Sequence, residues 1–388
     1  MRFVGAARAA LARRNDCKQL SAAAAVVLIG LFVSCGSSRH SGSSTPNHNA
    51  YATLPGRGAV AFLHINGSTG AITVASLTPQ VQGVSPKGLA LLPSKKFLYV
   101  VNSGADTIST FSVAGDGSLT LTKTPIPAGA GADQAVIDPS GAYLLVTNNF
   151  SNTVSVFTID ASSGALSEVG GSPFFANNDP SNILITPSGK FVYVSNPGIG
   201  MVTGFTFANG VLTPVLNTPT FSGAGAIGLA VDSGSKYLYV ANASALNPNV
   251  STIGNISGFN IDPSSGALTP IPGSPFTATL GNGPTALVVD PGGQFLYAAT
   301  SGTSASIWGF TIDPTNGQLI AVTGSPFSVS AGGLFALIDP LGNYLYFGSA
   351  TGNGVASFTY NSSTGVPTAI AGSPFSTGGP PGMMVLSE

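Results

Sequence analysis

The chain has 388 residues, and charged residues make up only 7% of it, against roughly 25% in typical soluble proteins. Its formal net charge is −1, and no basic stripe follows the first 34 residues, which excludes the usual electrostatic footprint of a nucleic-acid-binding protein. Glycine, serine, threonine and asparagine therefore supply most of the polar surface.

Residues 1–34 have the pattern of an export signal peptide. Basic residues up to Lys18 precede an apolar run at residues 22–33, which is shorter than the roughly 20 residues that a membrane span needs. Residues 32–36 read Phe-Val-Ser-Cys-Gly, which resembles a bacterial lipobox, where the cysteine is lipidated and becomes the first residue of the mature chain. The alternative is an ordinary signal peptide with an incidental cysteine.

Residues 35–50 predict a lipidated Cys35 followed by a flexible tether. The segment is rich in serine, glycine and asparagine, a composition typical of flexible linkers. Cys17 lies inside the signal, so Cys35 is the only thiol of the mature chain and no intramolecular disulfide is expected. We therefore expect an exported lipoprotein, held by its lipid at a membrane of the bacterial cell envelope.

Residues 51–388 contain a recurring unit. The unit repeats every 48 residues or so and combines short apolar strands with tight turns, a period and composition typical of a β-propeller (about 40–50 residues per blade). Clear copies are Asp-Pro-Ser-Gly at Asp138 and Asp-Pro-Leu-Gly at Asp339, each followed by a strand that is almost wholly apolar. Continuous apolarity predicts a strand that is buried on both faces between neighbouring blades.

Four strands per unit and one phenylalanine in each third strand define the blades. The phenylalanines are Phe62, Phe111, Phe157, Phe205, Phe259, Phe310 and Phe358. Residues 51–77 supply only the last three strands of a blade, whereas residues 382–387 match an inner strand such as 88–93. We therefore expect an all-β, seven-bladed propeller of four-stranded antiparallel blades, closed when the C-terminal strand joins the N-terminal blade.

The second strands carry a family resemblance. Tyr193-Val-Ser-Asn196 and Leu145-Val-Thr-Asn148 resemble the YVTN-type repeats of bacterial surface propellers. Together with the Asp-Pro-Ser-Gly turns and Asp-x-x-x-Gly-x-Leu hairpins, residues 51–388 are similar to the seven-bladed lactonase family, which includes 6-phosphogluconolactonase and carboxymuconate cyclase types. The resemblance implies the fold, but propellers host many functions, so the chemistry must be read from the site.

The starts of the inner strands should surround one mouth of the central channel. Aligning the repeats gives a first ring of equivalent positions: Lys87, Asp133, Ser181, Ile227, Thr285, Leu334 and Pro381. The second ring is Gly88, Gln134, Asn182, Gly228, Ala286, Phe335 and Gly382. Polar groups gather on three consecutive blades, as a small neutral ligand would require. The alternative is a solvated channel rim.

The predicted ligand-binding residues lie in these rings and in asparagine-rich loops of the same face. Lys87 and Asp133 can approach each other across neighbouring blades, and Asp179 in a blade-connecting loop can join them. The full set is Lys87, Asp133, Gln134, Asp179, Asn182, Asn148, Asn149 and Asn196. Most other aspartates belong to repeated turns, and their backbone hydrogen bonds explain them without a ligand.

Groups suited to catalysis are scarce in the mature chain. The family resemblance implies histidine, glutamate and arginine around the channel, but His40 and His48 fall in the expected tether and His64 falls at the end of a third strand, away from the ligand. No zinc spacing, calcium loop or phosphate-cradling glycine loop can be assembled, so no metal or cofactor is expected.

Two functions remain open from the sequence. The first is a monomeric, non-catalytic binding or scaffold module for a neutral glycan, peptide or envelope protein, without nucleic acid as a partner. The alternative is a lactonase-type hydrolase that opens a carbohydrate lactone, with Asp133 as base and Lys87 or Asn182 polarising the carbonyl group.

The lipobox makes a direct prediction. Replacing Cys35 (Cys35→Ala) should move the protein from the membrane fraction to the soluble fraction of the cell, because the thiol that carries the lipid is lost. Immunoblotting of the two fractions measures the change, and Cys17→Ala is the matched control that should leave the distribution unaltered. A Cys35→Ala protein that stays in the membrane fraction would show that the lipobox interpretation is wrong.

Overall fold

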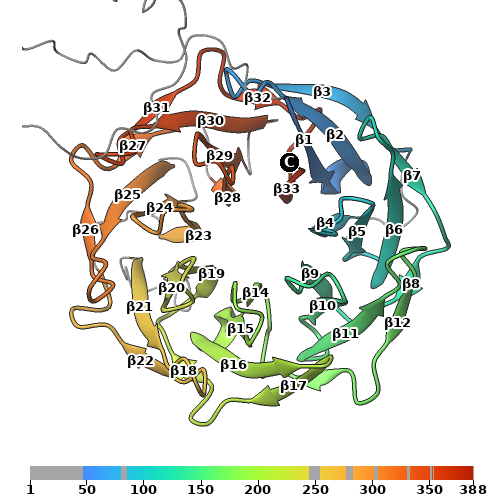
Figure 1. Ribbon diagram of the computed structural model, residues 1–388, viewed down its shortest axis with the longest axis horizontal. Coiled ribbons are helices and arrows are strands. Elements are labelled where there is room, and N and C mark those ends of the chain that lie inside the picture. The colour runs from blue at the N-terminus through green and yellow to red at the C-terminus, as the bar shows by residue number, and fades with distance from the viewer. Residues whose placement is uncertain are drawn as a thin grey trace, which may run out of the picture. The chain divides into compact units, whose positions relative to one another are not determined.

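The computed structural model describes residues 47–79, 85–243, 254–276, 283–300, 305–329, 333–349, 352 and 354–387. These residues form seven antiparallel sheets that stand around a central axis like the blades of a propeller (Figure 1). The predicted all-β, seven-bladed architecture is therefore confirmed. In the described part of the chain, no helix is long and apolar enough to cross a membrane.

The strands of each blade follow one another from the central axis outward. Blade 1 contains β33 (Met384–Ser387), β1 (His48–Leu54), β2 (Ala59–Ile65) and β3 (Ile72–Leu77). Blade 2 contains β4 (Pro86–Leu91), β5 (Phe97–Asn102), β6 (Thr107–Val113), β7 (Leu119–Leu121) and β8 (Ile126–Pro127). Blade 3 contains β9 (Ala132–Ile137), β10 (Tyr143–Asn148), β11 (Thr153–Ile159), β12 (Leu166–Glu168) and β13 (Phe174–Phe175).

The remaining four blades have the same arrangement. Blade 4 contains β14 (Ile183–Ile185), β15 (Phe191–Asn196), β16 (Met201–Ala208), β17 (Val211–Pro214) and β18 (Thr220–Phe221). Blade 5 contains β19 (Ala226–Val231), β20 (Tyr237–Asn242), β21 (Asn255–Ile261) and β22 (Leu268–Pro270). Blade 6 contains β23 (Pro284–Val289), β24 (Phe295–Thr300), β25 (Ser306–Ile312), β26 (Leu319–Ala321) and β27 (Phe327–Ser328). Blade 7 contains β28 (Gly333–Ile338), β29 (Tyr344–Ser349), β30 (Gly354–Tyr360), β31 (Pro367–Ala369) and β32 (Phe375–Ser376).

The outer strand is split into two short segments in five of the seven sheets, so the blades have four or five strands. In blade 3, β12 pairs with the end of β11 and β13 pairs with its start, so the outer strand is split into two segments. Between the segments, the Ser172 hydroxyl accepts a hydrogen bond of 2.9 Å from the backbone N–H of Val156. The serines of the other Ser-Pro-Phe motifs do the same in blades 5, 6 and 7: Ser274, Ser325 and Ser373. The motif therefore marks the break in the outer strand.

The apolar second strands form the core between blades. Every residue of β5 and of β15 is buried, as their continuous apolarity predicts. A buried tyrosine hydroxyl must find an acceptor, and Tyr99 donates to the backbone oxygen of Gly164 in the next blade at 3.1 Å. Five other tyrosines make the same contact with the next blade around the ring: Tyr51, Tyr193, Tyr239, Tyr297 and Tyr344. Burial raises the pKa of Tyr51 to about 12, which keeps its hydroxyl a donor.

The repeated aspartates hold turns. The Asp138 carboxylate accepts a hydrogen bond of 2.7 Å from the backbone N–H of Tyr143, which closes the turn between the first and second strands of blade 3. In the hairpin that follows the third strand, hydrogen bonds from Ser162 and Ser163 hold the pKa of Asp160 well below its usual range. These contacts agree with the structural role that the sequence assigns to the aspartates.

The C-terminal strand closes the ring, as predicted. β33 pairs with β1, with Met384 opposite Ala52, and Figure 1 shows it in the innermost place of blade 1. β1 begins at His48, so the predicted boundary between tether and propeller, after residue 50, lies inside this strand. His48 is buried in β1 and is not part of the tether, which corrects its placement from the sequence.

Removing the C-terminal strand should destroy the single cooperative unfolding transition. Deletion of residues 383–388 removes the burial of Met384, which contributes about 1.5–3 kcal/mol, and exposes the edge of β1. A thermal melt followed by circular dichroism measures the effect, and deletion of Glu388 alone is the control. An unchanged melting curve for the longer deletion would contradict the structural role of β33.

Candidate functional site

A cavity of about 440 Å³ opens at one mouth of the central channel. This volume falls in the range of small-molecule sites, about 300–1,000 Å³. The cavity is lined by residues of all seven blades, and these include every position of the two predicted rings except Gly88 and Pro381. The repeat alignment therefore identified the residues that surround the channel mouth.

The rings meet in the cavity because the inner strands bulge there. In blade 3, the pairing of β9 with β10 shifts between Ala132 and Ala135, so Asp133 and Gln134 fall outside the regular ladder. The pairing of β4 with β5 shifts in the same way around Lys87. Bulges redirect side chains and are common beside functional sites. Blades 5, 6 and 7 show register shifts at the equivalent places.

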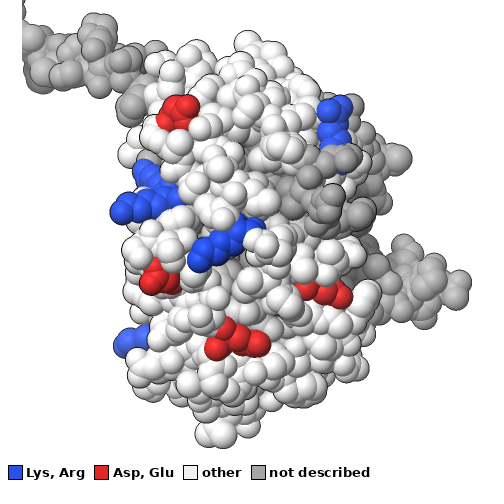
Figure 2. Space-filling model, turned by 90° about the vertical axis from the view of Figure 1, so that its right-hand side faces the viewer, with Lys and Arg blue, Asp and Glu red and all other residues white. Residues whose placement is uncertain are grey.

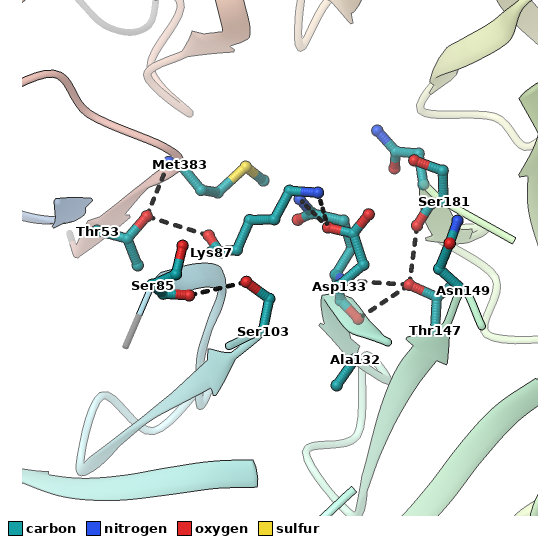
Figure 3. Close-up of polar contacts among 12 residues, drawn as sticks. Thr53, Ser85, Lys87, Ser103, Ala132, Asp133, Thr147, Asn149, Ser181 and Met383 are labelled. Carbon is teal, nitrogen blue, oxygen red and sulfur yellow. Dashed lines mark hydrogen bonds and ion pairs between the residues drawn. The ribbon is translucent and has the colours of Figure 1, made fainter. Parts of the chain in front are cut away.

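An ion pair between neighbouring blades is the main polar feature of the cavity. Lys87 Nζ on β4 lies 2.7 Å from Asp133 Oδ1 on β9. The side chain of Asp133 is 9% exposed, whereas that of Lys87 is 47% exposed. The Gln134 side chain donates a longer hydrogen bond of 3.4 Å to the same Asp133 oxygen. Figure 3 shows the Lys87 side chain extended towards the Asp133 carboxylate.

A glycine permits the close approach of these two strands. A Cβ atom at Gly88 would lie 2.6 Å from the backbone oxygen of Asp133, a distance that real Cβ contacts do not reach. Any larger residue would therefore push β4 away from β9. Gly88 belongs to the second ring, and its role is to bring Lys87 and Asp133 together rather than to contact a ligand.

Hydroxyl groups that the sequence did not reveal fix the backbone of the first ring. The Thr53 hydroxyl donates to the backbone oxygen of Lys87 at 3.0 Å and accepts from the backbone N–H of Met383 at 2.9 Å (Figure 3). Thr147 donates to the backbone oxygen of Ser181 at 2.8 Å, and Ser195 donates to that of Ile227 at 2.8 Å. The sequence signal that could have identified Thr147 and Ser195 is the hydroxyl residue at the next-to-last position of the YVTN-type motif.

Asn182 lies in the same cavity as the ion pair. It lines the cavity with Lys87, Asp133 and Ser181, and its backbone N–H donates to the Ser195 hydroxyl at 3.1 Å. Among the described residues, no hydrogen bond joins the Asn182 side chain to Lys87 or Asp133. The amide is therefore available to a ligand bound between them.

Asp179 and Asn149 form a separate contact at the rim. The Asn149 amide donates to Asp179 Oδ1, and the backbone N–H of Gly198 donates to Asp179 Oδ2 at 3.0 Å. Both carboxylate oxygens thus hold loops of blades 3 and 4. The structure does not bring Asp179 to the pair formed by Lys87 and Asp133, which the sequence had led us to expect.

Asn148 and Asn196 are parts of the scaffold, which corrects their assignment as ligand-binding residues. Both are fully buried. The Asn148 amide donates to the hydroxyls of Thr153 and Ser155, and that of Asn196 donates to backbone oxygens in the loop before blade 4. An asparagine at the same place in several repeats serves the fold of each blade, and this repetition was the signal against a ligand role.

The charges of the cavity cancel. Lys87 and Asp133 are the only ionisable side chains that line it among the described residues, and they bind each other. Figure 2 shows one side of the ring, where the few charged side chains are separated by uncharged surface. Among the residues that the structure describes, no three His, Cys, Asp or Glu side chains are grouped so as to hold a metal ion.

The cavity can therefore bind an uncharged molecule of small size. One wall offers an ammonium group, a carboxylate and two amides, which together can donate to a carbonyl oxygen and accept from a hydroxyl group or water. These are the functional groups that ester chemistry uses, although the set lacks a histidine.

Comparison with solved structures supports the fold. A provisionally assigned 6-phosphogluconolactonase from Bacteroides uniformis ATCC 8492 has a TM-score of 0.74 and 19% sequence identity, covering 88% of this chain and 99% of that one. A second, from Bacteroides fragilis NCTC 9343, has a TM-score of 0.72 and 20% identity, covering 89% and 100%. The periplasmic gluconolactonase PpgL of Pseudomonas aeruginosa has a TM-score of 0.69 and 17% identity, covering 88% and 99%.

The family assignment comes from the sequence. A comparison with curated proteins gave no match. The family described as "Lactonase, 7-bladed beta-propeller" matches residues 34–175, 171–275 and 254–383. These segments extend through all seven blades and include the ring positions from Lys87 to Gly382. The chain therefore belongs to the seven-bladed β-propeller lactonase family.

Proposed function

We propose that the central cavity binds an unphosphorylated lactone and hydrolyses it, with Asp133 as the general base. The observation that carries the proposal is the ion pair between Lys87 and Asp133, set at 2.7 Å in the cavity of a lactonase-family propeller. Membership of this family favours the hydrolase over the non-catalytic module that the sparse ionisable groups suggest. The names of the structural neighbours point the same way.

The charge of the cavity argues for a substrate without phosphate. A phosphate dianion is bound by uncompensated cations, usually arginine or several lysines. In this cavity the positive charge of Lys87 is already compensated by Asp133. An uncharged lactone does not need an uncompensated cation, because its carbonyl oxygen requires only hydrogen-bond donors.

The reaction follows from the roles that the lining residues can take. Asp133 accepts a proton from a water molecule, and the water oxygen attacks the lactone carbonyl carbon. The partly exposed Lys87 ammonium group donates a hydrogen bond to the carbonyl oxygen, which carries negative charge in the tetrahedral intermediate. The ring C–O bond then breaks, and the leaving oxygen takes the proton from Asp133, so that lactone plus water yields the hydroxy acid.

The ion pair also sets the expected rate. A positioned general base contributes about 10²–10⁴ to a rate. In the ion pair the Lys87 ammonium group contacts Asp133 Oδ1, so Lys87 must turn to the substrate before the two groups can act together. We therefore expect this protein to hydrolyse reactive, strained lactones at a modest rate.

A binding module remains the second candidate. It is favoured by a specific observation: the two ionisable lining residues are consumed by their own ion pair. In that case the cavity and its amides would recognise a neutral glycan, a peptide or an envelope protein. In either case we propose that the protein is an exported lipoprotein of the cell envelope and acts there.

Replacing the base tests the hydrolase directly. Asp133→Asn keeps the size of the side chain but removes the proton acceptor, so hydrolysis of a panel of lactones should fall about 10²-fold or more. The panel contains phosphorylated and unphosphorylated lactones, and pH-stat titration measures the acid released. Asp116→Asn, an exposed hairpin residue, is the matched control and should retain full activity. Equal turnover by the Asp133→Asn and control proteins would contradict the role of Asp133.

Thr53 offers a second test, because it positions Lys87 without contacting the substrate. Thr53→Val removes the donor to the Lys87 backbone oxygen and the acceptor of the Met383 N–H, which costs about 1–3 kcal/mol of stability. We expect kcat to fall about tenfold, because a small misplacement of a catalytic group is costly, and Thr53→Ser to restore it. Kinetics are measured well below the melting temperature of each variant. A Thr53→Val protein with lower stability but normal kcat would limit Thr53 to a structural role.

A further inference from the structure

We infer that the ligand of the central cavity is amphipathic: an uncharged lactone that carries an apolar substituent, such as a short alkyl chain. The lactone part of this inference rests on the proposed function, whereas the apolar part rests on the opposite wall of the cavity. That wall is independent of the ion pair and of any catalytic step.

The cavity has one polar and one apolar wall. Blades 2, 3 and 4 contribute most of the polar residues, from Ser85 to Asn182, and blade 6 adds Thr285, whose hydroxyl donates to the backbone oxygen of Gly333 at 2.8 Å. Blades 5, 6, 7 and 1 contribute the large apolar side chains: Ile227, Leu229, Leu287, Leu334, Phe335 and Met383. Figure 1 shows the inner strands β4 and β9, which carry Lys87 and Asp133, across the channel from β23 and β28, which carry Leu287, Leu334 and Phe335.

The fold does not require an apolar residue at two of these positions, those of Ile227 and Leu334, whereas Leu229, Leu287 and Phe335 belong to the buried core between blades. Ile227 and Leu334 occupy the ring position that holds Lys87, Asp133 and Ser181 in other blades, where polar side chains are accommodated. The same bulge of the inner strand therefore carries either kind of side chain, and the choice in blades 5 and 7 needs another cause.

The exposure of Leu334 indicates that the cause is a ligand. Leu334 is 47% exposed in the cavity, although a leucine at this position gains nothing from contact with water. Phe335 behind it is only 3% exposed, so a ligand would meet a firm wall with Leu334 at its surface. An apolar group laid against Leu334 and Ile227 would remove their apolar surface from water.

This wall selects against a sugar lactone. The hydroxyl groups of a sugar ring that faced Ile227, Leu334 and Met383 would lose water without gaining a partner, which is unfavourable. A lactone with an alkyl substituent avoids this loss. Its ring oxygen and carbonyl group can reach Lys87 and Asp133, while its chain crosses the channel towards blades 5 and 7.

The test is a series of γ-lactones with unbranched alkyl substituents of increasing length, compared with glucono-δ-lactone. Binding is measured by calorimetry on the purified Asp133→Asn variant, in which hydrolysis is expected to be slow, and hydrolysis is measured separately on the wild-type protein. We expect affinity to rise about threefold to fourfold for each added methylene until the cavity is full. Glucono-δ-lactone should bind more weakly than the longer members of the series.

Variants locate the effect. Leu334→Asn and Ile227→Asn should each flatten the dependence of affinity on chain length, since both place a polar group in the apolar wall. Leu341→Asn is the matched control: Leu341 is 60% exposed in the turn that begins at Asp339, outside the cavity lining, and its replacement should leave the dependence intact.

The outcomes separate this inference from the proposed function. Binding that rises with chain length but without hydrolysis would support the apolar wall and overturn the catalytic proposal. Hydrolysis of glucono-δ-lactone with no gain from an alkyl chain would support the hydrolase and overturn the amphipathic ligand. Failure of every alkyl lactone to bind would overturn the inference, as would a chain-length dependence that survives both cavity substitutions.

Discussion

Closure of the ring is the constraint on which the rest of the structure depends. A single blade has two apolar faces and cannot bury either without a neighbour. The pairing of β33 with β1 gives blade 1 its inner strand and leaves no blade without a neighbour on either side. Closure also affects the geometry of the cavity, because the Thr53 hydroxyl is hydrogen-bonded to the backbone of both Met383 and Lys87. The last residues of the chain thus help to place the first charged residue of the site.

Repetition explains why so much of the fold could be predicted from the sequence. The apolar second strands, the Asp-Pro-Ser-Gly turns and the third-strand phenylalanines recur because every blade packs against its two neighbours in the same way. The same logic aligned Lys87, Asp133 and the other ring positions, most of which line one cavity in the structure. It also explains the errors: Asn148 and Asn196 recur because each joins the second and third strands of its blade, and a recurring residue is weak evidence for a ligand.

Other features depend on three-dimensional detail that one sequence does not contain. Thr53 and Thr147 contact the next blade through single hydroxyl groups; the hydroxyl residue recurs in the motif, but its partner is a backbone oxygen, which the sequence does not identify. In blades 3, 6 and 7 the outer strand splits where a serine hydroxyl replaces a ladder contact. The start of β1 at His48 was missed because polar residues of the expected tether continue into the strand without a turn signal.

The cavity gains its character from departures from the repeat. The inner-strand bulge is common to several blades, but it presents a charged pair at Lys87 and Asp133 and apolar groups at Leu334 and Phe335. A ligand that met only the ion pair would have to separate two charges that already satisfy each other. Apolar contact on the far wall contributes binding free energy that needs no such separation. The two walls therefore act together: the apolar wall holds the ligand, and the ion pair can then exchange its internal contact for the carbonyl group.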